Sequence, residues 1–157
     1  MIMESTNEKS VFEVAEIQLS YKSKVKPSLR PKIECSKDAE KVLRQIWNSD
    51  QLEFVEEFKI LLTNRANKVL GALDVSHGGI VGTVADPKVI FACALKAAAC
   101  GIILAHNHPS GNLTASQADI ELTKKLSAGG RILEITVLDH IIITSESYFS
   151  FADEGLL

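Results

Sequence analysis

The sequence predicts an α/β domain in which helices flank a mixed central β-sheet. Apolar runs of strand length alternate with segments whose apolar residues recur at helical spacing. The run 101–105 suits a buried strand, and 132–144 is rich in β-branched residues. The Ala-rich stretch 86–99 is apolar enough to lie buried against a sheet. With 157 residues the chain suits one compact domain, with an N-terminal strand and basic loop over 1–35 and the main part over 36–157.

The N-terminal part is expected to provide an edge strand followed by a loop. Residues 11–21 alternate apolar and polar side chains, as in a half-buried strand. The segment 22–32 holds five basic residues, two prolines and no acidic residue. It could contact the phosphates of a nucleic acid or be a solvated connection. The absence of interleaved aromatic residues favours the connection.

A helix and a β-hairpin come next. Ser36 can cap a helix that ends near Trp47, whose ring would pack in the core or, at a helix edge, anchor a partner. Core packing is the expectation. Residues 53–63 and 68–75 are typical of two strands, joined by the polar turn 64–67.

The first strand of this hairpin places two adjacent glutamates on opposite faces. Glu56 shares its face with Phe58 and other apolar residues, whereas Glu57 shares the other face with Lys59. The carboxylate of Glu56 is therefore predicted to point inward. Burying a carboxylate is costly unless something offsets it, and a metal-bound water nearby would do so. The alternative places Glu56 in solvent at the mouth of the strand.

A glycine-rich loop precedes the second helix. The loop 77–83 lacks the spacing and the lysine of a phosphate-binding loop, so it is predicted to form the rim of a cleft. His77 would either approach a substrate there or be exposed. Asp86 as N-cap and Pro87 in the first turn predict a helix that reaches about Ala99.

The densest set of candidate ligands follows the strand 101–105. His106 and His108 are two positions apart at the strand end, so their imidazoles point the same way. Asp119 would add a carboxylate from the start of the next helix. Two imidazoles and one carboxylate give three metal ligands and leave a fourth position open, as in a catalytic zinc site. The pattern of His-x-His, seven intervening residues and Ser-x-x-Asp disfavours the alternative of histidines that only bond the backbone.

The helix after these histidines is predicted over 115–128. Thr114 and Gln117 would form the capping box that opens it, and Gly129-Gly130 would end it. Its first turns carry Ser116 on the same face as the aspartate.

The strand predicted over 132–144 contains a histidine at its centre. His140 could be a further ligand or a general acid, but a buried histidine paired to a polar neighbour is favoured. Residues 147–152 resemble a short closing strand.

Composition sets further bounds. The net charge of −3 gives no overall attraction to nucleic acid or to an anionic membrane, and no apolar run approaches the roughly 20 residues of a membrane span. Three cysteines without paired spacing indicate a reducing, cytoplasmic location. Cys93 and Cys100 lie near one helical face and could bind zinc, but both are expected to be small buried hydrophobes.

The histidine and Ser-x-x-Asp pattern resembles the JAMM (MPN+) metalloprotease signature, and the wider sequence is similar to the RadC-type branch of that family. The resemblance covers about residues 50–155. It rests on the strings Glu56–Leu62, Ala85–Pro87, His106–Asn112, Leu138–Ile143 and Ser147–Phe151. It implies a JAB/MPN domain, a cytidine-deaminase-like α/β/α fold with zinc at the edge of the sheet.

The resemblance also implies residue roles. They are Zn²⁺ ligation by His106, His108 and Asp119, stabilisation of the tetrahedral intermediate by Ser116, and general-base catalysis by Glu56, which strand parity favours over Glu57.

The expected function is zinc-dependent hydrolysis of a peptide or isopeptide bond in a peptide or protein substrate. The alternative is a DNA-repair accessory or interaction module with a non-catalytic or empty metal site, for which 22–32 is the only candidate nucleic-acid contact. Residues 1–50 leave no room for the helix-hairpin-helix segment of longer RadC proteins, which argues against direct DNA binding. A nuclease ranks last, because only Asp119 and Glu56 supply carboxylates.

Overall fold

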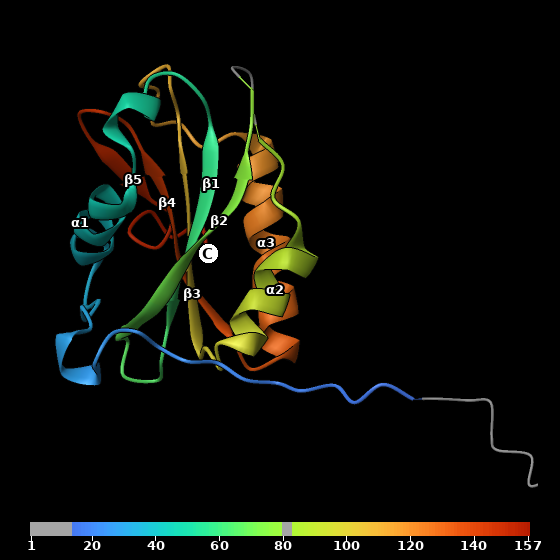
Figure 1. Ribbon diagram of the computed structural model, residues 1–157. Helices are drawn as coiled ribbons and strands as arrows, with labels where there is room; N and C mark the ends of the chain where they lie inside the picture. Colours follow the sequence, from blue (N-terminus) through green and yellow to red (C-terminus); the bar gives the residue numbers. More distant parts are fainter. Residues whose placement is uncertain (1–13, 80–82) are drawn as a thin grey trace, which may run out of the picture.

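The fold is a five-stranded mixed sheet with helices on both faces (Figure 1). The computed structural model describes residues 14–79 and 83–157. The strands lie in the order β2-β1-β3-β4-β5. Their bounds are β1 (Glu57–Thr63), β2 (Val69–His77), β3 (Gly101–Asn107), β4 (Thr136–Ile143) and β5 (Tyr148–Ser150). The helices are α1 (Ser36–Ile46), α2 (Pro87–Lys96) and α3 (Gln117–Ile132), with 3₁₀ turns η1 (Pro27–Leu29) and η2 (Ser49–Gln51).

Strand β3 is the centre of the sheet, and its pairing with β4 is the only parallel pairing among the described strands. It pairs antiparallel with β1 and parallel with β4, and α3 forms the crossover between β3 and β4. The start of α3 therefore lies at the end of the sheet where β3 ends. This crossover brings the strand-end histidines and the first turn of α3 together.

Two hydrophobic cores cover the two faces of the sheet. Helices α2 and α3 pack on one face through Ile90, Ala94 and Leu126. Helix α1 covers the other face through Ala39 and Leu43, as Figure 1 shows. Because both faces are covered, every residue of β1 and β3 is buried. The predicted α/β class is confirmed.

The N-terminal strand predicted over 11–21 is not formed in residues 14–21, and residues 11–13 lie outside the described residues. Val14, Ile17 and Leu19 are all exposed. The outer edge of β2 is instead met by the end of the basic loop: the N–H of Val69 donates to the carbonyl of Pro31. Of the described residues 14–21, Tyr21 still reaches β2, where its hydroxyl donates to the carbonyl of Leu70.

Strand β1 begins at Glu57, not at residue 53. The chain before it turns, because the N–H groups of Phe54 and Val55 both donate to the carbonyl of Gln51. Glu56 thus lies just before the strand. The second strand extends to His77, beyond the predicted end.

Helix α3 begins two residues later and ends later than predicted. Its N-cap is Ser116, and the capping box pairs Ser116 with Asp119, so the box predicted for Thr114 and Gln117 is wrong. The helix also runs through Gly129 and Gly130. A Cβ on Gly130 would lie 2.2 Å from the carbonyl oxygen of Ile135, so the turn into β4 requires glycine there.

Some of the remaining predictions are confirmed and others are wrong. Asp86 caps α2 as expected, accepting from the N–H of Lys88, and Trp47 is buried in the core. The prediction of buried cysteines is wrong for Cys100, which is exposed, whereas Cys93 is half-buried; Cys35 is exposed and all three thiols are free. Within the described residues, no helix has both the length and the apolar character that a membrane crossing requires.

Candidate metal centre

Three side chains predicted as ligands converge at the end of β3. One ligand atom from each of His106, His108 and Asp119 lies within 4.8 Å of the other two. The Nε2 atoms of the histidines are 3.0 Å apart. Oδ1 of Asp119 lies 3.3 Å from Nε2 of His106, and Oδ2 lies 3.8 Å from Nε2 of His108. The group combines one buried and two half-buried residues, so it can be reached from solvent on one side.

The two histidines are fixed by the sheet. His106 lies within β3, is 1% exposed and stacks on Phe58 of β1, with ring centroids 6.0 Å apart and planes at 4°. His108 follows the strand, and its N–H donates to the carbonyl of Ile143. Its Nδ1 lies 2.6 Å from the carbonyl oxygen of Asn112. Since a carbonyl oxygen only accepts, this Nδ1 carries the proton and a neutral His108 presents the lone pair of Nε2 to the site.

The carboxylate of Asp119 is held by the cap of α3. Its Oδ2 accepts from the hydroxyl of Ser116 at 2.7 Å and from the N–H of Ser116 at 2.8 Å. Burial raises the pKa of the Asp119 carboxyl, but the hydrogen bond and charge of His106 and the bonds from Ser116 outweigh burial and hold the pKa well below its usual value. Asp119 is therefore a carboxylate at neutral pH.

This donor set fits a cation. The lone pair of His108 faces a second imidazole nitrogen and a carboxylate, and all three are electron donors. The two ring nitrogens and the carboxylate repel one another unless a positive charge lies among them, and either a proton or a metal ion can supply that charge. Imidazole nitrogens with one carboxylate oxygen suit a divalent transition metal.

His140 lies behind His106, away from the other two ligands. It is fully buried, its Nε2 is 2.8 Å from Nδ1 of His106, and its Nδ1 is 2.6 Å from Oγ1 of Thr123. Burial, and then the charge of His106, lowers the pKa of His140 well below its usual value. The expected pairing of a buried histidine with polar neighbours is confirmed, and His140 is not a member of the converging ligand group.

Comparison with known proteins assigns the family. A family model described as "RadC-like JAB domain" matches residues 33–156. The chain belongs to the RadC-like JAB domain family. A UPF0758 protein of Flavobacterium johnsoniae is 43% identical over 149 residues, covering 94% of this chain and 64% of the relative. A UPF0758 protein of Porphyromonas gingivalis is 44% identical over 103 residues, covering 65% of this chain and 45% of the relative.

This RadC-like JAB domain thus spans less than two thirds of the length of these relatives. The match includes β1, β3, the capping box of α3 and β4, so every residue of the converging group lies within the family region.

The two candidate bases of the JAB domain have different surroundings. Glu57 is 4% exposed, with one carboxylate oxygen 2.7 Å from Nδ1 of His77 and the other 3.4 Å from Nζ of Lys59. Lys59 in turn contacts Asp74 at 2.7 Å and lies over the ring of Trp47. Glu57 is therefore held in a buried ion-pair network on the α1 face of the sheet. The face of β1 that carries Glu57 is thus buried as well, because α1 covers it.

Glu56 is half-buried just before β1, where its carbonyl accepts from the N–H of Gly78 at 2.8 Å. Glu56 has the parity of Phe58, whose ring stacks on His106. His77, predicted to approach a substrate or to be exposed, is exposed and paired with Glu57.

Asn107 is a positioning residue that the sequence analysis missed. Its side chain is fully buried; Nδ2 donates to the carbonyls of Leu52 and Val55, and Oδ1 accepts from the N–H of Glu57. These bonds tie the segment that carries Glu56 to the strand that carries the histidines. The signal was available: a polar residue of opposite parity between two histidines in a buried strand needs partners.

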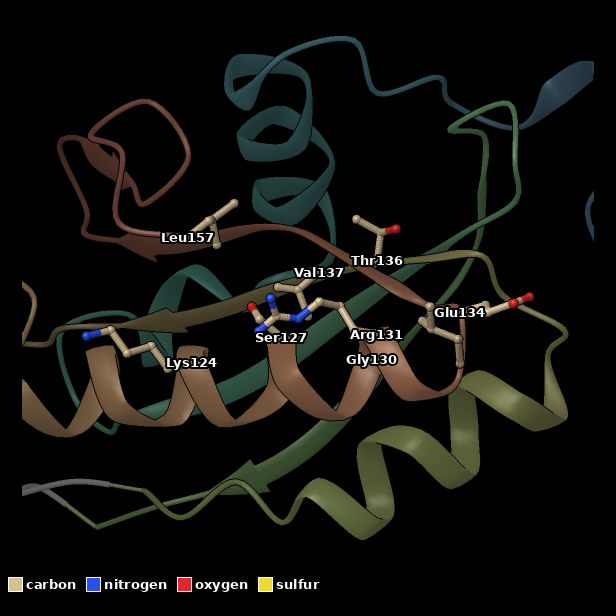
Figure 2. A pocket seen from close by; sticks show the side chains of 9 residues that line it. Lys124, Ser127, Gly130, Arg131, Glu134, Thr136, Val137 and Leu157 are labelled. Carbon is tan, nitrogen blue, oxygen red and sulfur yellow. The ribbon is translucent and has the colours of Figure 1, made fainter.

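A separate cavity lies away from this site. It encloses about 630 Å³ between α3, β4 and the C-terminal residue Leu157 (Figure 2). Lys124, Ser127 and Arg131 line it from α3, and Thr136 and Val137 line it from β4. None of its lining residues belongs to the metal group, the name used below for His106, His108 and Asp119. Its size therefore does not make it the candidate site.

Proposed function

We propose that this RadC-like JAB domain is a zinc-dependent hydrolase of peptide or isopeptide bonds. The observation that carries the proposal is the convergence of two Nε2 atoms and a carboxylate within reach of one metal ion. Membership of the JAB family, which includes metallohydrolases, supports the same reaction class.

Zinc is the metal proposed. Two nitrogens and one oxygen from protein suit zinc, and a site with three protein ligands leaves a position for water or substrate. A bound zinc ion supplies Lewis acidity: it lowers the pKa of water and polarises a carbonyl oxygen. His106, His108 and Asp119 would hold it.

Glu56 is proposed as the general base. It takes a proton from the attacking water and returns it to the leaving amine, a contribution of typically 10²–10⁴-fold. The ion-pair network of Glu57 supports this choice, since that carboxylate is committed to His77 and Lys59.

Ser116 is proposed to donate a hydrogen bond to the carbonyl oxygen as negative charge develops there. Its hydroxyl now donates to Asp119. When the carboxylate is bound to a cation, this hydroxyl proton becomes available to the substrate.

The test is zinc content by elemental analysis after dialysis without chelator. We expect about one zinc per chain in the wild type, none in Asp119→Ala, and unchanged content in Asp50→Ala, a control at an exposed aspartate outside the site. Screening of peptide and isopeptide libraries would then follow. A folded wild type that neither contains zinc nor takes it up on titration would refute the proposal.

That result would instead favour an interaction module. Lys22, Lys24 and Lys26 are exposed on the loop before α1 and are the proposed nucleic-acid contact in that case. DNA binding that weakens steeply with salt and falls when the three lysines are neutralised would support it.

A further inference from the structure

We infer that Thr123 and His140 are positioning residues that set the tautomer of His106. They form a buried relay, defined as Asp119 carbonyl, Thr123, His140 and His106, that leaves the Nε2 lone pair of His106 facing the metal group. The tautomer follows from the hydrogen bonds alone. Its use in metal binding rests on the proposed function.

The relay starts at a backbone carbonyl. Oγ1 of Thr123 lies 2.6 Å from the carbonyl oxygen of Asp119, one turn earlier in α3. A carbonyl has no proton to give, so the hydroxyl proton of Thr123 occupies this contact. The hydroxyl can therefore only accept from its second neighbour.

That second neighbour is Nδ1 of His140, 2.6 Å away. Because the hydroxyl accepts, Nδ1 of His140 carries a proton, and the Nε2 of the neutral ring is an acceptor. His106 approaches this Nε2 through its own Nδ1, at 2.8 Å, and must supply the proton of that bond. The neutral ring of His106 then has no proton on Nε2.

The surroundings keep this order of donors in place. Thr123 and His140 are fully buried and His106 is 1% exposed, so water does not compete for these contacts. The ring of His140 stacks on Phe151, with centroids 4.6 Å apart, and Phe58 stacks on His106. A flip of either ring would place carbon atoms where the hydrogen bonds now lie, at the cost of unpaired buried groups.

The relay also links the ligands. It begins at the backbone of Asp119, whose carboxylate faces the metal group, and it ends on His106, another member of that group. His108 reaches the same proton arrangement separately, through the carbonyl of Asn112. Both imidazoles thus present Nε2 lone pairs, each fixed by a different acceptor.

The direct test is the tautomer of His106 in metal-free protein, read from ¹⁵N-labelled histidines by long-range ¹H–¹⁵N correlation. We expect His140 to be protonated on Nδ1 and not on Nε2, and His106 to carry a proton on Nδ1. Thr123→Val, which keeps the side-chain shape but removes the acceptor, should change the ring-nitrogen shifts of both histidines. Thr123→Ser should restore them. A wild-type His106 without a proton on Nδ1, or a His140 protonated on Nε2, would overturn the relay, whether or not the protein binds zinc.

A second experiment tests the metal role. It measures the affinity for zinc, with no other ligand, by competition with a chelating dye. Loss of a partner behind a ligating histidine typically weakens metal binding 10–100-fold, so we expect about that loss in Thr123→Val and wild-type affinity in Thr123→Ser. His140→Gln, which keeps an acceptor for His106, should fall between them. Equal affinity in folded Thr123→Val and wild type would overturn the metal role. The expected tautomer in a wild type that binds no zinc would support the relay and refute the proposed function.

Discussion

The side-chain oxygen of Asn107 accepts a hydrogen bond of 2.7 Å from the backbone N–H of Glu57. With the two bonds that its amide donates to the carbonyls of Leu52 and Val55, Asn107 satisfies three backbone groups of a single segment. The position of Glu56 relative to the histidines therefore depends on one buried amide.

Asn107→Ala should destabilise the fold by about 3 kcal/mol or more, since each buried partner left unpaired costs roughly 1–3 kcal/mol. Urea unfolding measures the change. Asn48→Ala is the matched control, because Asn48 caps only a short exposed turn through the N–H of Asp50 and should cost about 1 kcal/mol. Equal losses in the two variants would show that the Asn107 bonds have little net value.

Replacement of the two glutamates should separate chemistry from stability. Glu56→Gln should retain zinc and lower turnover of any substrate found by screening about 10²–10⁴-fold. Glu57→Gln should lower the free energy of unfolding instead, by about 1–3 kcal/mol, because it removes one buried partner of Lys59 while Asp74 remains. Zinc content, turnover and urea unfolding are measured for both. Loss of metal in Glu56→Gln would contradict its assignment as base.

Ser116 is the N-cap of α3 and the proposed hydrogen-bond donor to the substrate, and two substitutions can separate these roles. Ser116→Ala should cost about 1 kcal/mol of stability through the lost cap, whereas Ser116→Gly should cost only a few tenths. Neither variant has a hydroxyl, so both should lose turnover equally if that hydroxyl contacts the reacting oxygen. If turnover in Ser116→Ala and Ser116→Gly instead falls in proportion to the loss of stability, Ser116 acts only as the helix cap.

Stability should fall with acid because of His140. The pKa of His140 is lowered in the folded state, so between that pKa and the unfolded value of about 6.5 the unfolded chain binds more protons. The contribution is thus complete above pH 6.5 and is lost as the pH falls below it, by at most about 1.4 kcal/mol per pH unit. Urea unfolding of metal-free protein from pH 7.5 to 5 measures the slope. His140→Gln should be flatter, and an identical slope would contradict this origin.

Gly130→Ala should destabilise the domain by about 1–3 kcal/mol, because the added Cβ would meet the carbonyl of Ile135 and the backbone must move. Gly71→Ala in β2 is the control, since a Cβ there meets nothing within 4 Å. Thermal unfolding compares the two, and equal midpoints would show that the turn into β4 adapts at no cost.

The metal group was predictable because its signal is local. The parity of β3 aligned His106 with His108, and Ser-x-x-Asp placed Asp119 in the first turn of a helix, where the structure has it. The helix start was not predictable in the same way. Thr114 and Ser116 are equally good caps in isolation, and the contact of Asp119 with His106 selects the second.

Features that depend on distant packing were missed. Strand parity marks Glu57 and Lys59 as a polar face, but α1 covers that face, and the charges are buried as an ion-pair network. The alternation over 11–21 predicted a strand, yet pairing needs an available edge, and Pro31 occupies part of the edge of β2. Sequence pattern gives the direction of a side chain but not what it meets.

The relay has a consequence for biosynthesis. The three candidate ligands lie within a short stretch that ends at Asp119, whereas His140 is translated 21 residues later. At about 5–20 residues per second, a nascent chain carries the complete ligand set for roughly one to four seconds before the ribosome adds the histidine that fixes its protons. Until β4 pairs with β3, His106 is free to adopt either tautomer. Under the proposed function, His106 would therefore hold its Nε2 lone pair ready for a metal ion only after β4 has paired with β3.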